Sequence, residues 1–266
     1  MSLKKKDKGA RTDIDKIIIL VIVIAVIVMV LLFIFKVDIL KYFKNLLPDL
    51  GNNNNIEDNL VDQEPLKEIT EQDLLKVMNY YKDNNVANSE GNLKRCDCGR
   101  ECALYAKSIK KYSDKNNLDP SVVLAVIMQE SNCQKNQVSQ LKCVGLMQIC
   151  VDSWSICVKD LGLTSETWRE TLLKNPDKNI ACGTKILKAK YDEYKNGVYE
   201  SRPYKTNDYF RKDVDLCITE YPFFENYEDI DAALRGYNGW ACKDDSQIYY
   251  VENVNLIEER LRVTSV

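Results

Sequence analysis

The feature that most constrains this chain is an apolar run near its N-terminus. Residues 17–35 read IIILVIVIAVIVMVLLFIF, which is 19 consecutive positions without a polar side chain. A helix of that length rises about 28 Å, close to the thickness of the hydrocarbon core of a bilayer. A helix of a soluble domain is rarely apolar on every face for so long. The run therefore predicts a single transmembrane helix.

The charges on either side of this run predict its orientation. Residues 1–16 contain six Lys and Arg side chains, whereas residues 36–50 contain three. The positive-inside rule then makes residues 1–16 a cytoplasmic basic tail and places everything after the run outside the cell membrane. A cleaved signal peptide is the alternative. We favour an uncleaved anchor, because the run is longer than a usual signal-peptide core and no small-residue cleavage site directly follows it.

The segment after the apolar run has the composition of a linker. Residues 36–68 include the stretch GNNNN at positions 51–55, and Pro48 and Pro65 punctuate them. Such a segment cannot bury enough apolar surface to offset the entropy lost on ordering. We therefore expect a flexible stalk over residues 36–68 and a folded domain over residues 69–264.

The absence of histidine removes several mechanisms. None of the 266 residues is a histidine, so neither a Ser-His-Asp triad nor a Cys-His pair can form. Acid–base chemistry must come from a carboxyl, Lys, Tyr or Cys whose pKa is shifted. We found no motif for a metal, nucleotide or other cofactor and expect none. The net charge of −3 gives no reason to expect a nucleic-acid partner.

The ten cysteines predict disulfides. All ten lie between Cys96 and Cys242, and an even number confined to one region is typical of an oxidising compartment. Free buried thiols are the alternative. The cluster Cys96, Cys98 and Cys102 could also bind a metal, although local disulfides are favoured without histidine. We further expect at least one bridge among three cysteines near the candidate site and their neighbours: Cys133, Cys143 and Cys150.

The folded part reads as mainly α. Thr70 and Asp73 have the spacing of a capping box, and Asp119 followed by Pro120 is a strong helix start. Few segments alternate with the period of two that strands require. Beyond the apolar stretch 122–128, further helices are expected over residues 177–194, 227–237 and 248–261.

Glu130 is the carboxyl with the most suggestive position. It follows the apolar stretch 122–128 and shares a helical face with Val123, Val126 and Ile127. A carboxyl at the end of an apolar face loses hydration, which raises its pKa toward the value that a general acid needs. The alternative is an ordinary Glu at a helix end that points to solvent.

Glu130 also begins an ordered series of short motifs. The series is Glu130-Ser131, Gly145-Leu-Met-Gln-Ile149, the block 179–187 with Asn179 and Gly183, Gly236-Tyr-Asn-Gly239, and Tyr250-Val251-x2-Val254. In this order and spacing, residues 100–260 resemble lytic transglycosylases of the soluble-lytic-transglycosylase (SLT) type. That family belongs to the lysozyme-like α superfamily and is related to goose-type lysozymes.

The resemblance implies a role for each matching residue. Glu130 would be the sole catalytic acid and base, and Ser131 would orient it or contact the substrate. The segment Gly145–Gln148, including Met147, would line the cleft, with Gln148 touching a sugar. Tyr237 would position the Glu130 carboxyl, and Asn238 would hold an N-acetyl or hydroxyl group.

The implied reaction is cleavage of the β-1,4 bond between N-acetylmuramic acid and N-acetylglucosamine in peptidoglycan, giving 1,6-anhydromuramic ends. A lysozyme-like hydrolase is an alternative if a second carboxylate faces Glu130. The long segment 195–226 offers three candidates: Asp215, Glu220 and Glu225. A catalytically silent glycan-binding scaffold is a further alternative. The process served would be wall remodelling, or local wall opening for a secretion or conjugation machine.

One motif departs from the family pattern. The family usually reads Ala-Tyr-Asn-Ala-Gly where this chain reads Gly-Tyr-Asn-Gly-Trp over residues 236–240. The loop after Asn238 must therefore differ. Trp240 could stack on a sugar face, or it could be a core tryptophan beside Cys242.

Overall fold

The computed structural model describes residues 68–88, 91–240, 242 and 245–265, which all belong to one compact unit, Pro65–Val266. The predicted tail 1–16 and anchor 17–35 lie outside the described residues, as does the predicted stalk apart from Glu68. Among the described residues, no helix has both the length and the apolar character needed to cross a membrane.

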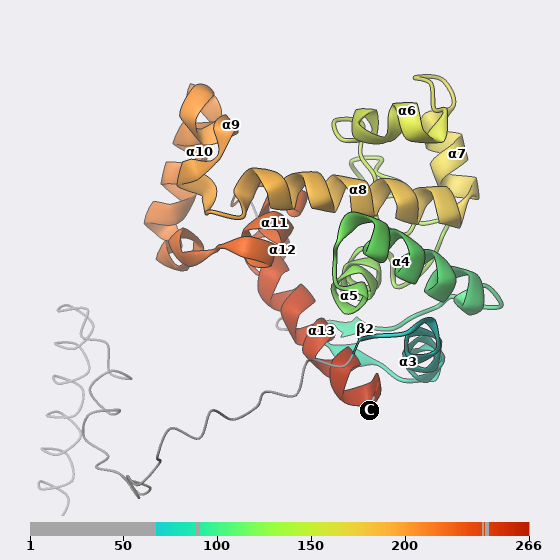
Figure 1. Ribbon diagram of the computed structural model, residues 1–266. Helices are drawn as coiled ribbons and strands as arrows, with labels where there is room; N and C mark the ends of the chain where they lie inside the picture. The colour runs from blue at the N-terminus through green and yellow to red at the C-terminus, as the bar shows by residue number, and fades with distance from the viewer. Residues whose placement is uncertain (1–67, 89–90, 241, 243–244, 266) are drawn as a thin grey trace, which may run out of the picture. The chain divides into compact units, whose positions relative to one another are not determined.

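The prediction of a mainly α fold is confirmed. A single two-stranded antiparallel hairpin, β1–β2, accompanies the helices in the described part of the chain (Figure 1). In chain order the elements are α3 Glu71–Asp83, β1 Val86–Ala87, β2 Leu93–Lys94, α4 Cys102–Asn116, α5 Pro120–Ser131, η1 Trp154–Cys157, α6 Val158–Leu161, α7 Trp168–Lys174, α8 Pro176–Tyr194, η2 Val198–Glu200, α9 Arg202–Thr206, α10 Asp208–Glu220, η3 Pro222–Asn226, α11 Asp229–Asn238, α12 Asp245–Ile248 and α13 Tyr250–Ser265.

Two predicted helix starts form as expected. The Thr70 hydroxyl accepts from the Asp73 N–H, and the Asp73 carboxylate accepts from the Thr70 N–H, which completes the capping box of α3. Asp119 caps α5 by accepting from the Ser121 N–H at 2.8 Å, with Pro120 in the first helical position. These caps satisfy backbone donors that would otherwise lack partners.

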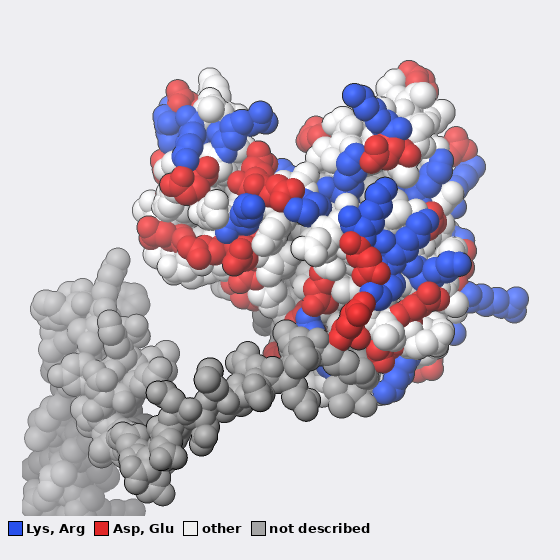
Figure 2. Space-filling model, in the orientation of Figure 1, with Lys and Arg blue, Asp and Glu red and all other residues white. Residues whose placement is uncertain are grey.

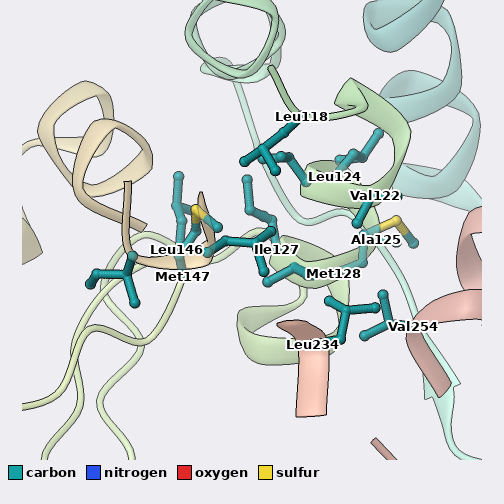
Figure 3. Packing of buried hydrophobic residues seen from close by; sticks show 14 of the residues in the cluster. Leu118, Val122, Leu124, Ala125, Ile127, Met128, Leu146, Met147, Leu234 and Val254 are labelled. Carbon is teal, nitrogen blue, oxygen red and sulfur yellow. The ribbon is translucent and has the colours of Figure 1, made fainter. Parts of the chain in front are cut away.

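Helix α5 forms the centre of the core. Its residues from Ser121 to Met128 are all buried, so the helix is covered on every side. Figure 3 shows Ile127 and Met128 between Leu146 on one side and Leu234 and Val254 on the other. The end of α5 is thus fixed by packing from both sides, which suits a helix that carries a functional residue.

The remaining long helices pack around α5 in pairs. Helix α13 packs along α5, α4 along α8, and α8 along α11 (Figure 1). In the same view α9 and α10 lie at one end of α8, while α6 and α7 lie at the other. The segment 195–226, expected from sequence only as a long connection, is itself helical and contains η2, α9, α10 and η3.

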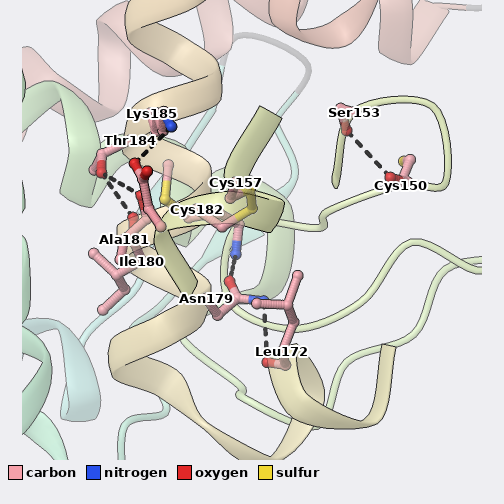
Figure 4. Close-up of a disulfide and its surroundings, with 12 residues drawn as sticks. Cys150, Ser153, Cys157, Leu172, Asn179, Ile180, Ala181, Cys182, Thr184 and Lys185 are labelled. Carbon is pink, nitrogen blue, oxygen red and sulfur yellow. Dashed lines mark hydrogen bonds and ion pairs between the residues drawn. A yellow bond between two sulfur atoms is a disulfide. The ribbon is translucent and has the colours of Figure 1, made fainter. Parts of the chain in front are cut away.

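All ten cysteines form disulfides, as the even count predicted. The expected bridge near the candidate site is present twice, because Cys143 pairs with Cys150 and Cys133 with Cys96. The metal alternative for the first cluster is wrong, since its cysteines are oxidised. The other pairs are Cys98–Cys102, Cys157–Cys182, drawn in Figure 4, and Cys217–Cys242.

The surface carries charges of both signs. In the face shown in Figure 2, Lys and Arg side chains alternate with Asp and Glu. Several lysines are paired, for example Lys110 with Asp114 and Lys185 with Asp160.

Candidate active site

Glu130 lies in the last turn of α5, where the chain leaves the core. Asn132 ends the helix in the left-handed conformation with a φ of 50°, and its N–H donates to the Met128 carbonyl. Asn tolerates this conformation better than most residues. The Glu130 side chain is partly exposed, whereas the eight residues before Gln129 are buried. The carboxyl is therefore at the border between the core and solvent.

A tyrosine from the last helix holds the Glu130 carboxyl. The Tyr250 hydroxyl donates to Glu130 Oε1 at 2.6 Å, the short distance expected for a bond to a charged acceptor. Burial raises the pKa of Glu130 to about 7, while the Tyr250 hydrogen bond and the charge of Lys94 act in the opposite direction. A carboxyl with that pKa is present in both protonation states near neutral pH and can serve as an acid or as a base.

The pairing of α13 with α5 is fixed at its far end. There the Ser121 hydroxyl donates to Glu258 at 2.7 Å, and Arg262 forms ion pairs with both Asp119 and Glu258. These contacts set the register of two antiparallel helices. That register brings Tyr250, at the start of α13, to the end of α5.

Tyr237 contacts a different partner from the one expected. Its hydroxyl donates to the Met147 carbonyl at 2.7 Å, and Tyr250 is the residue that donates to Glu130. The Glu130 charge nevertheless raises the pKa of both tyrosines, with burial as the larger cause. Tyr237 thus lies near the carboxyl, but it connects α11 to the turn that contains Met147.

The turn 145–148 is held by buried polar contacts. The Asn179 side chain accepts from the Met147 N–H at 2.9 Å and donates to the carbonyls of Val144 and Leu172 (Figure 4). Gly145 has a φ of 79°, and a Cβ there would lie 2.1 Å from Asn179 Nδ2. Only glycine fits this close approach.

Three of the residues expected to contact the substrate are buried. Gly145 is buried against Asn179. The Met147 side chain is fully buried. It packs against Gly183, where a Cβ would overlap it. Ser131 is only 4% exposed, and its hydroxyl donates to the Leu146 carbonyl at 2.8 Å, which ties the end of α5 to the turn. The roles of these three residues as substrate contacts stay predictions of the resemblance.

Gln148 and Asn238 are both partly exposed. Gln148 is partly exposed, and its Nε2 donates to the carbonyls of Gly145 and Gln137, which leaves its side-chain oxygen as an acceptor. Asn238 ends α11, and its Nδ2 is buried with no hydrogen-bond partner among the described residues. A buried donor without a partner costs about 1–3 kcal/mol until an acceptor arrives.

The rival carboxylates lie elsewhere. Asp215 accepts from Tyr204 at 2.7 Å within the insertion, and Glu220 and Glu225 are exposed. None of the three influences the pKa of Glu130, which responds to Tyr250 and Lys94. None of these three carboxylates therefore acts on Glu130.

Two residues near Asn238 support the site without facing a ligand. Trp240 is 3% exposed and packs 5.6 Å from Tyr194, as the core alternative for this tryptophan required. Arg235 is fully buried, donates to the Gln247 carbonyl, and lies 4.5 Å from the Phe224 ring. Desolvation lowers its pKa to about 10. The sequence did not single out Arg235, because an arginine two residues before Tyr237 in a predicted helix has the pattern of a solvent-exposed charge.

A comparison with protein families identifies the domain. The model of the transglycosylase SLT domain matches residues 107–248, which is more than half of the chain. The chain belongs to the transglycosylase SLT domain family. The match includes Glu130, the turn 145–148 and Asn238, and it ends just before Tyr250. The resemblance expected from the motifs is confirmed.

Individual relatives match over shorter parts. The chain is 28% identical over 97 residues to membrane-bound lytic murein transglycosylase C of Edwardsiella ictaluri, covering 35% of this chain and 26% of that protein. The 70 kDa soluble lytic transglycosylase SLT70 of Escherichia coli aligns at 22% identity and a TM-score of 0.41, over 61% of this chain and 25% of that one.

A second solved structure, an inactive mutant of the lytic transglycosylase Slt of Pseudomonas aeruginosa, aligns at 18% identity and a TM-score of 0.39. It covers 58% of this chain and 23% of that one. The chain thus spans about a quarter of the length of these relatives.

Proposed function

We propose that this SLT domain cleaves the β-1,4 bond between N-acetylmuramic acid and N-acetylglucosamine in peptidoglycan by lytic transglycosylation. One observation carries the proposal: Glu130 is a single carboxyl with a pKa raised to about 7, held by Tyr250, on which no second carboxylate acts. Family membership and the names of the relatives agree with this reaction.

In the first step Glu130 acts as the acid. The protonated carboxyl gives its proton to the glycosidic oxygen, the bond from that oxygen to C1 of the muramic sugar breaks, and the N-acetylglucosamine side leaves as an alcohol. The carbonyl oxygen of the muramic N-acetyl group stabilises the positive charge at C1. Glu130 is now a carboxylate, and the Tyr250 hydroxyl donates to it.

In the second step Glu130 acts as the base. The C6 hydroxyl of the same muramic sugar attacks C1, and Glu130 takes its proton. A 1,6-anhydro ring forms, no water is consumed, and Glu130 returns to its protonated form. Attack within one molecule has a large proximity advantage over attack by a free water. A pKa of about 7 suits both steps, because neither protonation state is far in energy from the other.

Two side chains are suited to position the sugar. The Asn238 Nδ2 group lacks an acceptor within the described structure, and an N-acetyl carbonyl would supply one. The Gln148 side-chain oxygen can accept from a sugar hydroxyl, since its amide group is already held by two carbonyls. We assign substrate binding to these two residues and scaffolding to Ser131, Gly145 and Met147.

The test is a digest of purified peptidoglycan by the full chain, followed by mass measurement of the released muropeptides. We expect products lighter by one water than those of a hydrolase. The Glu130→Gln variant should lose roughly 10²–10⁴ in rate while still sedimenting with peptidoglycan.

Two outcomes of the digest would overturn the proposal. Products with reducing ends would show a hydrolase. Absence of turnover by the wild type, with unchanged binding by Glu130→Gln, would show a glycan-binding scaffold.

We also propose that the domain is held at the outer face of the cell membrane. The tail 1–16, anchor 17–35 and stalk 36–68 support this arrangement through their charge and hydropathy alone. Five disulfides in the domain fit an oxidising compartment. Protease added to intact spheroplasts should remove residues 69–264, and full protection of the domain would contradict the orientation. Recruitment to a secretion or conjugation machine stays a prediction of the resemblance.

A further inference from the structure

The hairpin β1–β2 and the loop after it precede the segment that matches the SLT family. Figure 1 shows this hairpin beside α13 and below the end of α5. Three contacts hold the loop to the end of α5. Cys96 forms a disulfide with Cys133, Asp97 N–H donates to the Asn132 carbonyl at 2.8 Å, and Arg95 N–H donates to the Asn132 side chain at 3.1 Å.

Because of this attachment, strand β2 places Lys94 on the last turn of α5. Its ammonium donates to the Gln129 carbonyl at 2.8 Å, one residue before Glu130. The carbonyls at the end of a helix lack intrahelical partners and carry partial negative charge, so a cation there is stabilising. Lys94 is partly buried, which reduces the screening of its charge by solvent.

We propose that Lys94 is a positioning residue for Glu130: the covalently anchored hairpin holds its ammonium at the Gln129 carbonyl, one residue before Glu130, and this positive charge favours the charged form of the Glu130 carboxyl. The inference rests on the proposed function, because that form is the base of the second step. Burial alone disfavours that form and so opposes the transfer of the Glu130 proton to the glycosidic oxygen, which creates it. Lys94 partly offsets this effect.

The other groups that face Glu130 cannot replace this charge. Tyr250 from α13 and Tyr237 from α11 both have a pKa well above its ordinary value, so both remain neutral around neutral pH. Tyr250 contributes a hydrogen bond to the carboxyl and no charge. Among the described residues, Lys94 is the charged group that acts on the pKa of Glu130.

The primary experiment titrates Glu130 by carbon NMR of side-chain carboxyls in the full chain, with the Glu130→Gln spectrum for assignment. Lys94→Met removes the charge and the hydrogen bond, Lys94→Gln removes the charge and keeps a donor, and Lys94→Arg keeps both. We expect the Glu130 midpoint to rise by roughly 0.2 to 0.7 pH unit in the Met and Gln variants, as for the loss of a partly exposed ion pair.

Two controls define what counts as a charge effect at this position. Lys94→Arg should keep the wild-type midpoint. Lys185→Met removes a distant lysine that pairs with Asp160, and it should also leave the midpoint unchanged. An unchanged midpoint in Lys94→Met would overturn the proposal. A rise in Lys94→Met but not in Lys94→Gln would overturn it as well, because the hydrogen bond rather than the charge would then be responsible.

The second readout is the pH profile of kcat/KM on peptidoglycan. This parameter requires protonated Glu130 in the free enzyme, so its alkaline limb should move upward by the same amount in Lys94→Met and Lys94→Gln. An NMR shift in a chain that shows no turnover would sink the proposed function and leave the Lys94 inference standing. Turnover with an unshifted alkaline limb and an unshifted NMR midpoint would overturn the Lys94 inference and leave the proposed function standing.

Discussion

The turn 145–148 and the end of α11 differ in how completely their polar groups are paired. The turn 145–148 is satisfied by Asn179, by the Ser131 hydroxyl and by the Tyr237 hydroxyl. The end of α11 has unpaired donors. Within the described structure, the Asn238 Nδ2 group and the indole N–H of Trp240 are buried without hydrogen-bond partners.

This difference separates scaffold from binding surface. Backbone groups that are already paired contribute to stability and have little left to offer a ligand, so in the turn it is the Gln148 side-chain oxygen that stays available. A buried donor without an acceptor lowers stability, and a ligand that supplies the acceptor recovers that energy. The motif residues of the SLT family therefore do not all serve one purpose. We propose that some hold the turn in place and that others bind the glycan.

An Asn→Ala substitution in each segment tests this difference. We expect the larger loss of stability in the turn. Asn179→Ala removes three buried hydrogen bonds: the Met147 N–H and the Leu172 carbonyl lose their Asn179 partner, and the Val144 carbonyl keeps the Ile149 N–H. We expect a loss of about 2–4 kcal/mol in the free energy of unfolding, measured by urea titration. The control is Asn84→Ala at an exposed position, which loses one amide hydrogen bond. It should change the free energy of unfolding by less than about 0.5 kcal/mol. Equal losses in both variants would contradict the scaffold role of the turn.

The sequence predicted the local features of the fold better than its longer-range ones. Local signals predicted the caps at Thr70 and Asp119, the buried helix before Glu130 and the pairing of all cysteines within the domain. Each of these depends on neighbouring residues or on composition. The helical insertion 195–226 was expected only as a connection, because its mixed charges and aromatic residues show no strong period.

The site itself was predicted as a set of residues but not as a network. Glu130, Gln148 and Asn238 occupy positions that fit the expected roles, whereas Ser131 and Met147 turned out to be buried. Tyr250 was noted in the last motif but given no role. The reason is physical: which of two tyrosines reaches a carboxyl depends on the register between α5 and α13, and distant contacts such as Ser121 with Glu258 set that register.

Glu130 lies between the two segments, and its raised pKa predicts a pH-dependent stability. The folded protein binds the Glu130 proton more tightly than the unfolded chain, whose carboxyl titrates near its ordinary value. The stabilising contribution of this group is therefore complete below about pH 4.5 and is lost as the pH rises through about 7. Glu130→Gln should be more stable than wild type by roughly 1–3 kcal/mol at pH 8 and should lose that advantage at pH 4.5. Urea unfolding at the two pH values tests this. A variant less stable than wild type at pH 8 would mean that the carboxylate is well solvated, and the assignment of a general acid would fail with it.

The smallest effect on stability should come from Asn238→Ala, which makes the same change as Asn179→Ala in the other segment. Its Nδ2 group has no partner to lose within the described residues, and relief of its desolvation cost offsets the packing lost with the side chain. We therefore expect the free energy of unfolding to change by less than about 0.5 kcal/mol. Binding should respond instead, because an N-acetylated glycan would lose a hydrogen bond worth about 1 kcal/mol, or roughly a fivefold rise in Kd. Calorimetric titration with chitin oligosaccharides, compared with their de-N-acetylated forms, measures this loss. If Asn238→Ala weakens both ligands equally, the amide does not recognise the N-acetyl group. If it instead destabilises the fold as much as Asn179→Ala does, the end of α11 is scaffold too, and the proposed distinction between the two segments is wrong.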